Sequence, residues 1–455
     1  MSLQKTVLAV LAVIGLASPA TLHSQGDTVA LHATLEGWAE DLWLRLVDRD
    51  AAHYGRLSDQ GILQRFNPTV NADYVIGLMR SRFGLLDDYA WYHQARGARL
   101  WAGSITTRDV AEGADVKVPV TLGERWSAGL DLNKVDSPEM TRALARLSFT
   151  YAAPNGRFAT ARGTIVPIKP SNDLALTLGW RRGTREISLT FALLDAFTNL
   201  VYQDLKVFYG FADTALAYDR QPLALRAKVD LPFARRLRME ADGAVMKPAT
   251  VRAYVQSAPD SGFRQDESYG FATTLVEWQA TPAVTAGLYG TYVRARLART
   301  PLLNGRAVDR FGLTEEEYHV GGLVLARPSS RFLLEGWMER NWRPQTELFP
   351  TGAAPNVDYL DRAWTGQATV WYRAPGGFIA DLAFDMDLRE VVRGEGQVLH
   401  TNEGSLGRHN KELRLEGGWR FPTFLLLVGL GYDLDPGKYP RGWFSGAQGR
   451  FAMRF

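Results

Sequence analysis

The chain of 455 residues contains no cysteine. Disulfide bridges, thiolate metal sites and covalently attached haem all require sulfur, so the sequence excludes them. A strong charge of one sign is also missing, because 52 basic residues stand against 49 acidic ones. A basic surface for nucleic acid is therefore not expected. No cofactor is predicted from the sequence.

Long hydrophobic runs are missing as well. A membrane-spanning helix needs about 20 apolar residues, and the longest candidate in the body of the chain, 421–432, is interrupted by proline and glycine. Residues 1–24 have a shorter apolar run, 6–17, which follows Lys5 and precedes small residues. This is the layout of a secretory signal peptide. We predict that the segment is removed on export; a buried N-terminal helix or a retained anchor is the alternative.

The sequence does contain a regular alternation of apolar and polar residues from about residue 96 onwards. In 223–231 the odd positions are apolar and the even positions from Arg226 are charged. In 378–388 the even positions are apolar and aspartates occupy Asp381 and Asp385 on the other side. Successive side chains of a strand point to opposite faces. The alternation therefore predicts strands with one apolar and one charged face.

The connections between these segments alternate between short and long. Four short turns are led by Pro282, Pro328, Pro375 and Pro422, which are 46 or 47 residues apart. Longer polar stretches are predicted as loops at 195–221, 247–266, 298–316, 344–361 and 391–408. Short turns on one rim and long loops on the other are typical of bacterial outer-membrane barrels.

The C-terminus carries a second resemblance to that family. Alternating apolar positions end on an aromatic residue, at Ala447, Gly449, Phe451, Met453 and Phe455. This resembles the signal that Gram-negative outer-membrane barrels present to the barrel-assembly machinery, although the family usually has a larger residue than Gly449. The resemblance implies that the last strand ends in the periplasm, and counting backwards then places every short turn on the periplasmic side.

We therefore predict an all-β fold, a transmembrane antiparallel up-and-down β-barrel formed by residues 96–455. The alternating segments number eighteen, and sixteen to twenty strands are compatible with the pattern. Residues 25–95 differ, because apolar residues such as Leu35 and Leu42 recur at helical spacing. This segment is predicted as a helical periplasmic plug or cap. The alternative is two further strands, because 29–35 also alternates.

The sequence contains no complete motif for a metal site, a dinucleotide site or a serine hydrolase. There is no His-Glu-x-x-His pair for a metal. The glycines at Gly429 and Gly431 lack the third glycine of a dinucleotide site, since Leu434 takes its place. Glu403 stands where a serine-hydrolase elbow needs its first glycine. Neither an enzyme nor a metal site is predicted.

The remaining candidate site is the lumen of the barrel, lined by the charged face of the strands. The lumen candidates are Arg226, Lys228, Arg236, Arg238, Asp381, Asp385, Asp387, Glu412 and Arg414. Such charges either set the field that a passing solute feels or neutralise one another, and the sequence leaves both readings open. Aromatic residues near strand ends, among them Trp278, Trp342 and Trp419, are expected in the two interfacial girdles.

The leading functional hypothesis is a porin-like channel for small hydrophilic solutes or ions in the cell outer membrane. The alternatives are a surface barrel that binds or attaches exopolysaccharide, and the barrel sheath of a porin–cytochrome conduit. Expected partners are outer-membrane lipid and lipopolysaccharide, the barrel-assembly machinery, and small solutes or a glycan. The oligomeric state stays open.

Overall fold

The computed structural model describes Ala39, Trp43 and the residues 97–104, 110–136, 141–165, 172–196, 214–255, 257–307, 310–348, 357–393, 397–399, 409–434 and 444–454. The predicted signal peptide, 1–24, lies outside the described residues. So does the predicted plug segment, 25–95, apart from Ala39 and Trp43, which are both helical. No helix in the described part of the chain is long and apolar enough to span a membrane.

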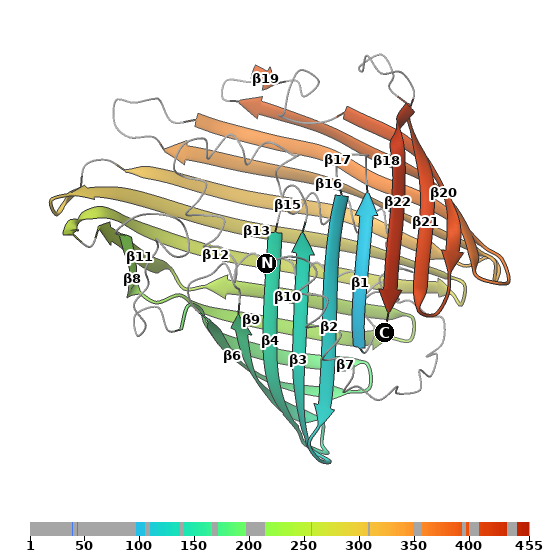
Figure 1. The fold of residues 1–455 in the computed structure, drawn as a ribbon, viewed down its shortest axis with the longest axis horizontal. Coiled ribbons are helices and arrows are strands. Elements are labelled where there is room, and N and C mark those ends of the chain that lie inside the picture. Colours follow the sequence, from blue (N-terminus) through green and yellow to red (C-terminus); the bar gives the residue numbers. More distant parts are fainter. Residues whose placement is uncertain are drawn as a thin grey trace.

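All described strands belong to one antiparallel sheet (Figure 1). They are β1 (Gly97–Ser104), β2 (Val110–Thr121), β3 (Trp126–Asp136), β4 (Thr141–Ala152), β5 (Arg157–Ile165), β6 (Asp173–Arg182), β7 (Arg185–Leu193), β8 (Thr214–Arg220), β9 (Leu223–Ala234), β10 (Leu237–Met246), β11 (Ala249–Val255), β12 (Ala258–Thr281), β13 (Val284–Leu303), β14 (Arg306–Ala307), β15 (Phe311–Ala326), β16 (Phe332–Leu348), β17 (Val357–Arg373), β18 (Phe378–Arg393), β19 (Gln397–Leu399), β20 (His409–Arg420), β21 (Phe424–Asp433) and β22 (Phe444–Arg454).

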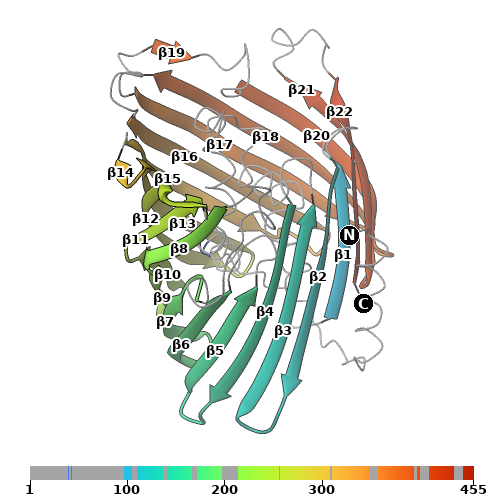
Figure 2. The same cartoon turned by 60° about the vertical axis from the view of Figure 1, so that its left-hand side comes forward.

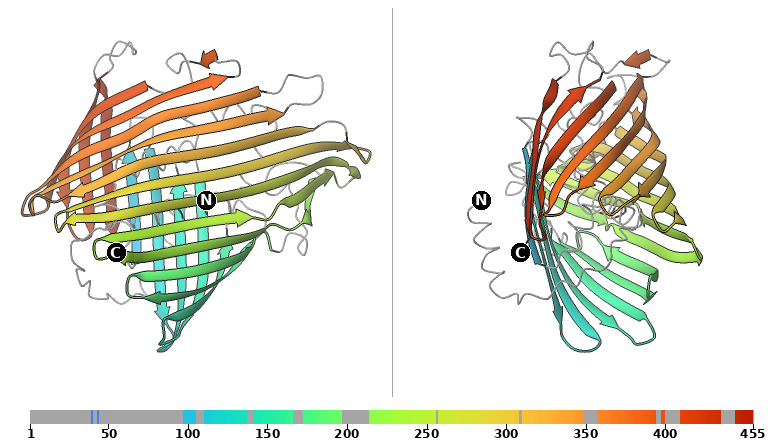
Figure 3. Two further views of the ribbon diagram at one scale, coloured as in Figure 1. Left: turned by 180° about the vertical axis from the view of Figure 1, so that it is seen from behind. Right: turned by 90° about the vertical axis from the view of Figure 1, so that its right-hand side faces the viewer.

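The sheet closes on itself. β1 pairs with β22 from Arg99 opposite Arg454 to Ser104 opposite Gly449, which joins the first strand to the last. Of the 22 described strands, four (β8, β11, β14 and β19) add short ladders beside the ring, which leaves eighteen that each pair with the next. The prediction of an antiparallel up-and-down β-barrel with about 18 strands is confirmed. Figures 2 and 3 show the ring from three further sides, with the strands of its two walls crossing at a steep angle.

The turns on one rim are short. Arg182 pairs with Arg185 across a two-residue turn in which Gly183 has φ +60°. In the turn between β4 and β5, Gly156 has φ +87°, and a Cβ there would lie 2.5 Å from the backbone oxygen of Arg181. Glycine is therefore required by both the backbone conformation and the neighbouring strand. The rim of short turns is also the rim at which β22 ends.

Two of the predicted long loops are wrong. The stretch 247–266 contains β11 and the first part of β12, and 298–316 contains the end of β13 and the start of β15. β13 instead turns tightly at Asn304 and Gly305, whose φ angles of +49° and +74° suit a two-residue hairpin. The loops were predicted because both faces of these strand ends are polar. Beyond a bilayer the outer face no longer has to be apolar, so the alternation fades although the strand continues.

The two faces of the ring differ in polarity. On β6, the outward side chains Leu174, Leu176 and Leu178 are exposed, whereas the inward hydroxyl of Thr177 hydrogen-bonds to that of Thr190 over 2.8 Å. An apolar outer face and a polar inner face are what a bilayer demands of a barrel that surrounds water.

Aromatic rings mark the edges of the apolar band. Near the short turns, Phe332 packs against Tyr372 at 5.3 Å between ring centroids. Ten residues further along β16, Trp342 stacks on Tyr318 at 5.5 Å, and Tyr318 contacts Tyr292 on β13. Ten residues of a strand tilted by about 40° span roughly 25 Å, the height of the apolar band of membrane barrels. We call Tyr292, Tyr318 and Trp342 the upper aromatic row.

Candidate functional site: the barrel lumen

Charged side chains on the inner wall of β9 and β10 form ion pairs across the two strands. Arg226 donates two hydrogen bonds of 2.9 Å to the two carboxylate oxygens of Asp242. Arg238 pairs in the same bidentate way with Asp230. Bidentate guanidinium–carboxylate pairs fix orientation as well as charge. These two pairs therefore hold the β9–β10 wall in a defined geometry. Within each pair the positive and the negative charge cancel.

A second group of charges lies on the inner wall of β18 and β20. The Arg414 side chain is only 1% exposed and lies 3.3 Å from an Asp385 oxygen and 3.6 Å from a Glu416 oxygen. Asp385 also accepts a hydrogen bond of 2.8 Å from the amide of Gln367 on β17. Asp381 and Glu412 are buried on the same wall. Of these five described charged side chains, four are acidic and only Arg414 is basic.

Seven of the nine predicted lumen residues lie on the inward face of their strands. Side chains of Arg226, Lys228, Arg238, Asp381, Asp385, Glu412 and Arg414 share the inward parity of their strands. Arg236 does not, because the alternation stops at Ala234 and Arg236 lies in the exposed β9–β10 turn, where it donates to the Ala280 carbonyl over 3.2 Å. The side chain of Asp387 lies outside the described residues.

The structure adds a cluster around Glu339 that sequence spacing does not reveal. The Glu339 carboxylate accepts hydrogen bonds from Tyr289 (2.7 Å), Asn341 (3.2 Å) and Thr365 (3.3 Å), and lies 3.1 Å from Nδ1 of His319. These residues come from β13, β15, β16 and β17. Glu339 has the inward parity, which could be read from the sequence. Its partners lie up to 50 residues away and meet it only through the register of four strands.

Inward threonines make the wall polar without charge. Hydroxyl pairs bridge neighbouring strands at 2.7 to 2.9 Å, between Thr150 and Thr160, Thr177 and Thr190, and Thr273 and Thr291. Hydroxyl pairs of this kind stabilise strand pairing. They also add hydrogen-bond donors and acceptors to the inner wall.

Two helical residues, Ala39 and Trp43, lie against the inner wall. Ala39 is fully buried and Trp43 is 6% exposed, and both join an apolar cluster with Ala192, Ala224 and Phe271, which are buried residues of β7, β9 and β12. The Arg226 guanidinium lies over the Trp43 ring at 5.4 Å from its centroid. Residues 39 and 43 are one helical turn apart and share a face. That face lies against the inner wall.

The geometry defines a class of protein, a transmembrane β-barrel with a polar, ion-paired lumen. No group of histidine or acidic side chains among the described residues could hold a metal ion.

No protein-family model matches the chain, and no curated protein matches it. Among solved structures, the chain is similar to a bacterial polysaccharide outer membrane secretin, with 10% identity over 79% of this chain and 99% of that chain and a TM-score of 0.35. It is similar to the FrpB iron transporter from Neisseria meningitidis, with 8% identity over 78% and 74% and a TM-score of 0.41. It is also similar to OmpT, an outer membrane protein of Vibrio cholerae, with 8% identity over 79% and 95% and a TM-score of 0.34. These likenesses concern the barrel fold alone.

Proposed function

We propose that the protein is an outer-membrane β-barrel of a Gram-negative cell and acts as a porin-like channel for small hydrophilic solutes or ions. The observation that carries the proposal is the closed ring of eighteen strands with an inner wall of charged and hydroxyl side chains. Barrels of 16 to 18 strands are wide enough to leave an aqueous channel. The signal-peptide layout of 1–24 and the aromatic C-terminus support export and assembly in the outer membrane.

The segment 25–95 narrows this channel in the proposal. Its described residues Ala39 and Trp43 are buried against the wall of β7, β9 and β12. The contact between Trp43 and Arg226 anchors the segment to a guanidinium that Asp242 already holds in place. Ala39 and Trp43 therefore cover a part of the inner wall, and in the proposal the rest of the segment follows them into the lumen.

The selectivity expected from the wall is weak. Several charges of the described wall are paired across strands, as in Arg226–Asp242 and Arg238–Asp230. A paired wall exerts a smaller field on a passing ion than an unpaired one. Small solutes of either charge and neutral hydrophilic solutes are the proposed cargo.

Single-channel conductance of the purified protein in a planar bilayer tests the proposal. The full chain is expected to conduct, and a variant lacking 27–90 is expected to conduct more. If neither form conducts while both retain the barrel, as judged by β-type circular dichroism and a heat-dependent shift on a gel, the channel is refuted. Surface attachment of a glycan would then be the function to examine. Conduction by the truncated form alone would instead make the protein a conduit that a partner opens.

A further inference from the structure

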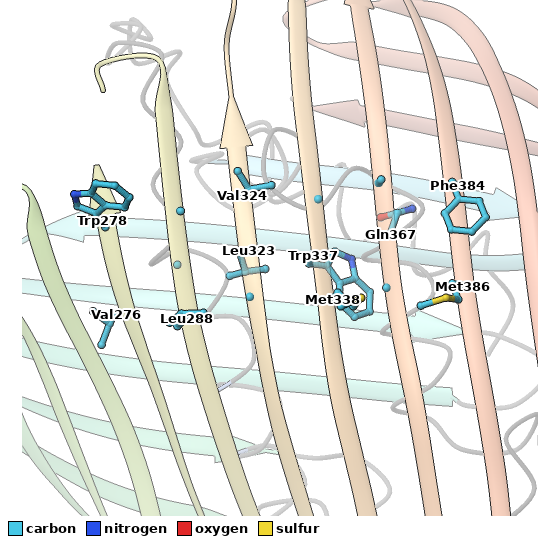
Figure 4. Close-up of a pocket in the computed structure, with 16 residues that line it drawn as sticks. Val276, Trp278, Leu288, Leu323, Val324, Trp337, Met338, Gln367, Phe384 and Met386 are labelled. Atoms are coloured by element: carbon cyan, nitrogen blue, oxygen red, sulfur yellow. The ribbon is translucent and has the colours of Figure 1, made fainter. Parts of the chain in front are cut away.

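The outer surface of the barrel contains an apolar groove with a volume of about 610 Å³ across β12 to β18 (Figure 4). Glycines on neighbouring strands, Gly322, Gly336 and Gly366, form its floor in the middle. Leu288 and Met338 stand beside them and are 72% and 52% exposed. The nearest atom to a Cβ built on Gly322 or Gly336 is a side-chain carbon, at 3.5 and 3.4 Å. The groove therefore exists because side chains are missing, and a larger residue at either glycine would fill it.

The groove lies at the height of lipid acyl chains. Met338 follows Phe332 by six residues and precedes Trp342 by four on the same strand, so it lies between the two aromatic edges of the apolar band. Almost the whole lining is apolar, with Trp278 and Phe384 at its ends. A hydrocarbon chain is the ligand that suits such a surface at this depth.

Arginines stand on the outer face of β13 and β16, two of the strands that line the groove, at the upper aromatic row and beyond it. Arg340 lies two residues beyond Met338 on β16, with its guanidinium 5.4 Å from the centroid of the Trp364 ring. Two residues beyond Tyr292, Arg294 lies 3.5 Å from Glu316, and Arg296 follows it on the same face of β13.

These arginines leave positive charge in excess on this part of the surface. Glu316 offsets Arg294, but in the described part of the chain no carboxylate pairs with Arg340 or Arg296. Arg340 is instead held by an aromatic ring, which keeps its N–H groups available. The groove and this excess of positive charge occupy the same stretch of wall. Together they suit a ligand with an apolar tail and an anionic head.

We propose that the groove and Arg340, Arg294 and Arg296 form a binding site for lipopolysaccharide. One acyl chain lies in the groove. The phosphates of the headgroup are held by the arginines, one by Arg340 beside the groove and another by Arg294 and Arg296 further along the wall. The inference rests on the proposed outer-membrane location, in which the rim of long loops faces the outer leaflet. Lipopolysaccharide has the required chemistry, because its lipid A part carries several acyl chains and phosphates on a disaccharide.

The test is a titration of the full-length protein in detergent with lipid A, and separately with phosphatidylcholine, counting bound lipid by native mass spectrometry. One variant, Arg340→Gln with Arg296→Gln, removes charge; a second, Gly322→Leu with Gly336→Leu, fills the groove. Arg182→Gln on the opposite rim is the control for charge. Gly163→Leu is the control for bulk, because it lies on the outer face of β5 with no atom within 4 Å of an added Cβ.

Wild-type protein and both controls are expected to bind lipid A in preference to phosphatidylcholine. Each arginine removed should lower the affinity for lipid A about fivefold, and filling the groove should lower the affinity for both lipids. Equal affinity of wild type and the arginine variant overturns the site, as does equal binding of both lipids by wild type. A dimer that disappears when the groove is filled would assign the surface to a second copy and also overturn it. Channel conductance of all these variants should be unchanged, since none touches the lumen; loss of the lipid effect alone leaves the channel standing.

Discussion

The Arg226 guanidinium lies 5.4 Å from the centroid of the Trp43 ring while both oxygens of Asp242 accept its hydrogen bonds at 2.9 Å. The Asp242 carboxylate thus orients the Arg226 guanidinium that contacts the Trp43 ring. A cation over an aromatic face contributes about 0.5 to 2 kcal/mol. The contact joins Trp43 to the inner wall of the barrel.

Trp43→Ala should raise the conductance of the full-length protein. The substitution removes both the contact with Arg226 and the burial of the ring in the apolar cluster, worth about 2 to 4 kcal/mol together. The segment 25–95 then spends more time away from the wall, and current recordings should show longer or larger openings. Trp126→Ala, which removes an outward-facing ring that is 55% exposed, is the control. Identical currents in the two variants would show that Trp43 does not restrict the path.

Asp242→Asn should destabilise the barrel by about 3 kcal/mol, because it leaves the largely buried Arg226 guanidinium without its counter-charge. Replacing both residues, as Arg226→Leu with Asp242→Leu, should cost less than the single change, since no unpaired charge remains. Thermal unfolding followed by circular dichroism measures both. A double variant less stable than the single one would mean that the ion pair itself stabilises the wall.

Glu339→Gln should shift the channel towards anions. It removes a negative charge from the inner wall and leaves His319 and the three hydrogen-bond donors of the cluster facing a neutral amide. The reversal potential in a salt gradient is the measurement, and the shift should shrink at high salt because of screening. Glu124→Gln in an exposed turn between β2 and β3 is the matched control. An unchanged reversal potential would place Glu339 outside the conduction path.

Phe451→Lys should impair assembly. Phe451 lies on the outer face of β22 and packs against Phe424 at 5.4 Å, so a lysine there places charge against lipid at a cost of up to about 2 to 4 kcal/mol. Combined with replacement of Phe455, which lies outside the described residues, it should leave protein in the periplasm. Phe444→Lys at the other end of the strand is the control, since the proposed signal needs only the C-terminal end. Normal insertion of the Phe451 variant, measured by membrane fractionation, would refute the signal.

The barrel itself could be predicted because its evidence is local. Period-two alternation in 223–231 and 378–388 depends only on which way successive side chains point, and a bilayer forces one face of every spanning strand to be apolar. Turn residues such as Gly183 likewise determine the chain direction within a stretch of about four residues. Strand number, the polarity of each face and the rim of short turns follow from such patterns.

Other features were decided only by the tertiary structure. The strands of 247–266 and 298–316 were missed because outside the bilayer no constraint makes one face apolar. Arg236 was misplaced because alternation cannot tell the last residue of a strand from the first of a turn.

The partners of Arg226 and Glu339 depend on strand register, and Trp43 meets Arg226 across almost 200 residues of chain. The sequence by itself determined the strands and the polarity of their faces, because these depend on neighbouring residues and on the surrounding bilayer. Only the tertiary structure decided which charges neutralise each other and that Trp43 lies on the wall, because strand register and packing set these contacts and local sequence patterns do not specify them.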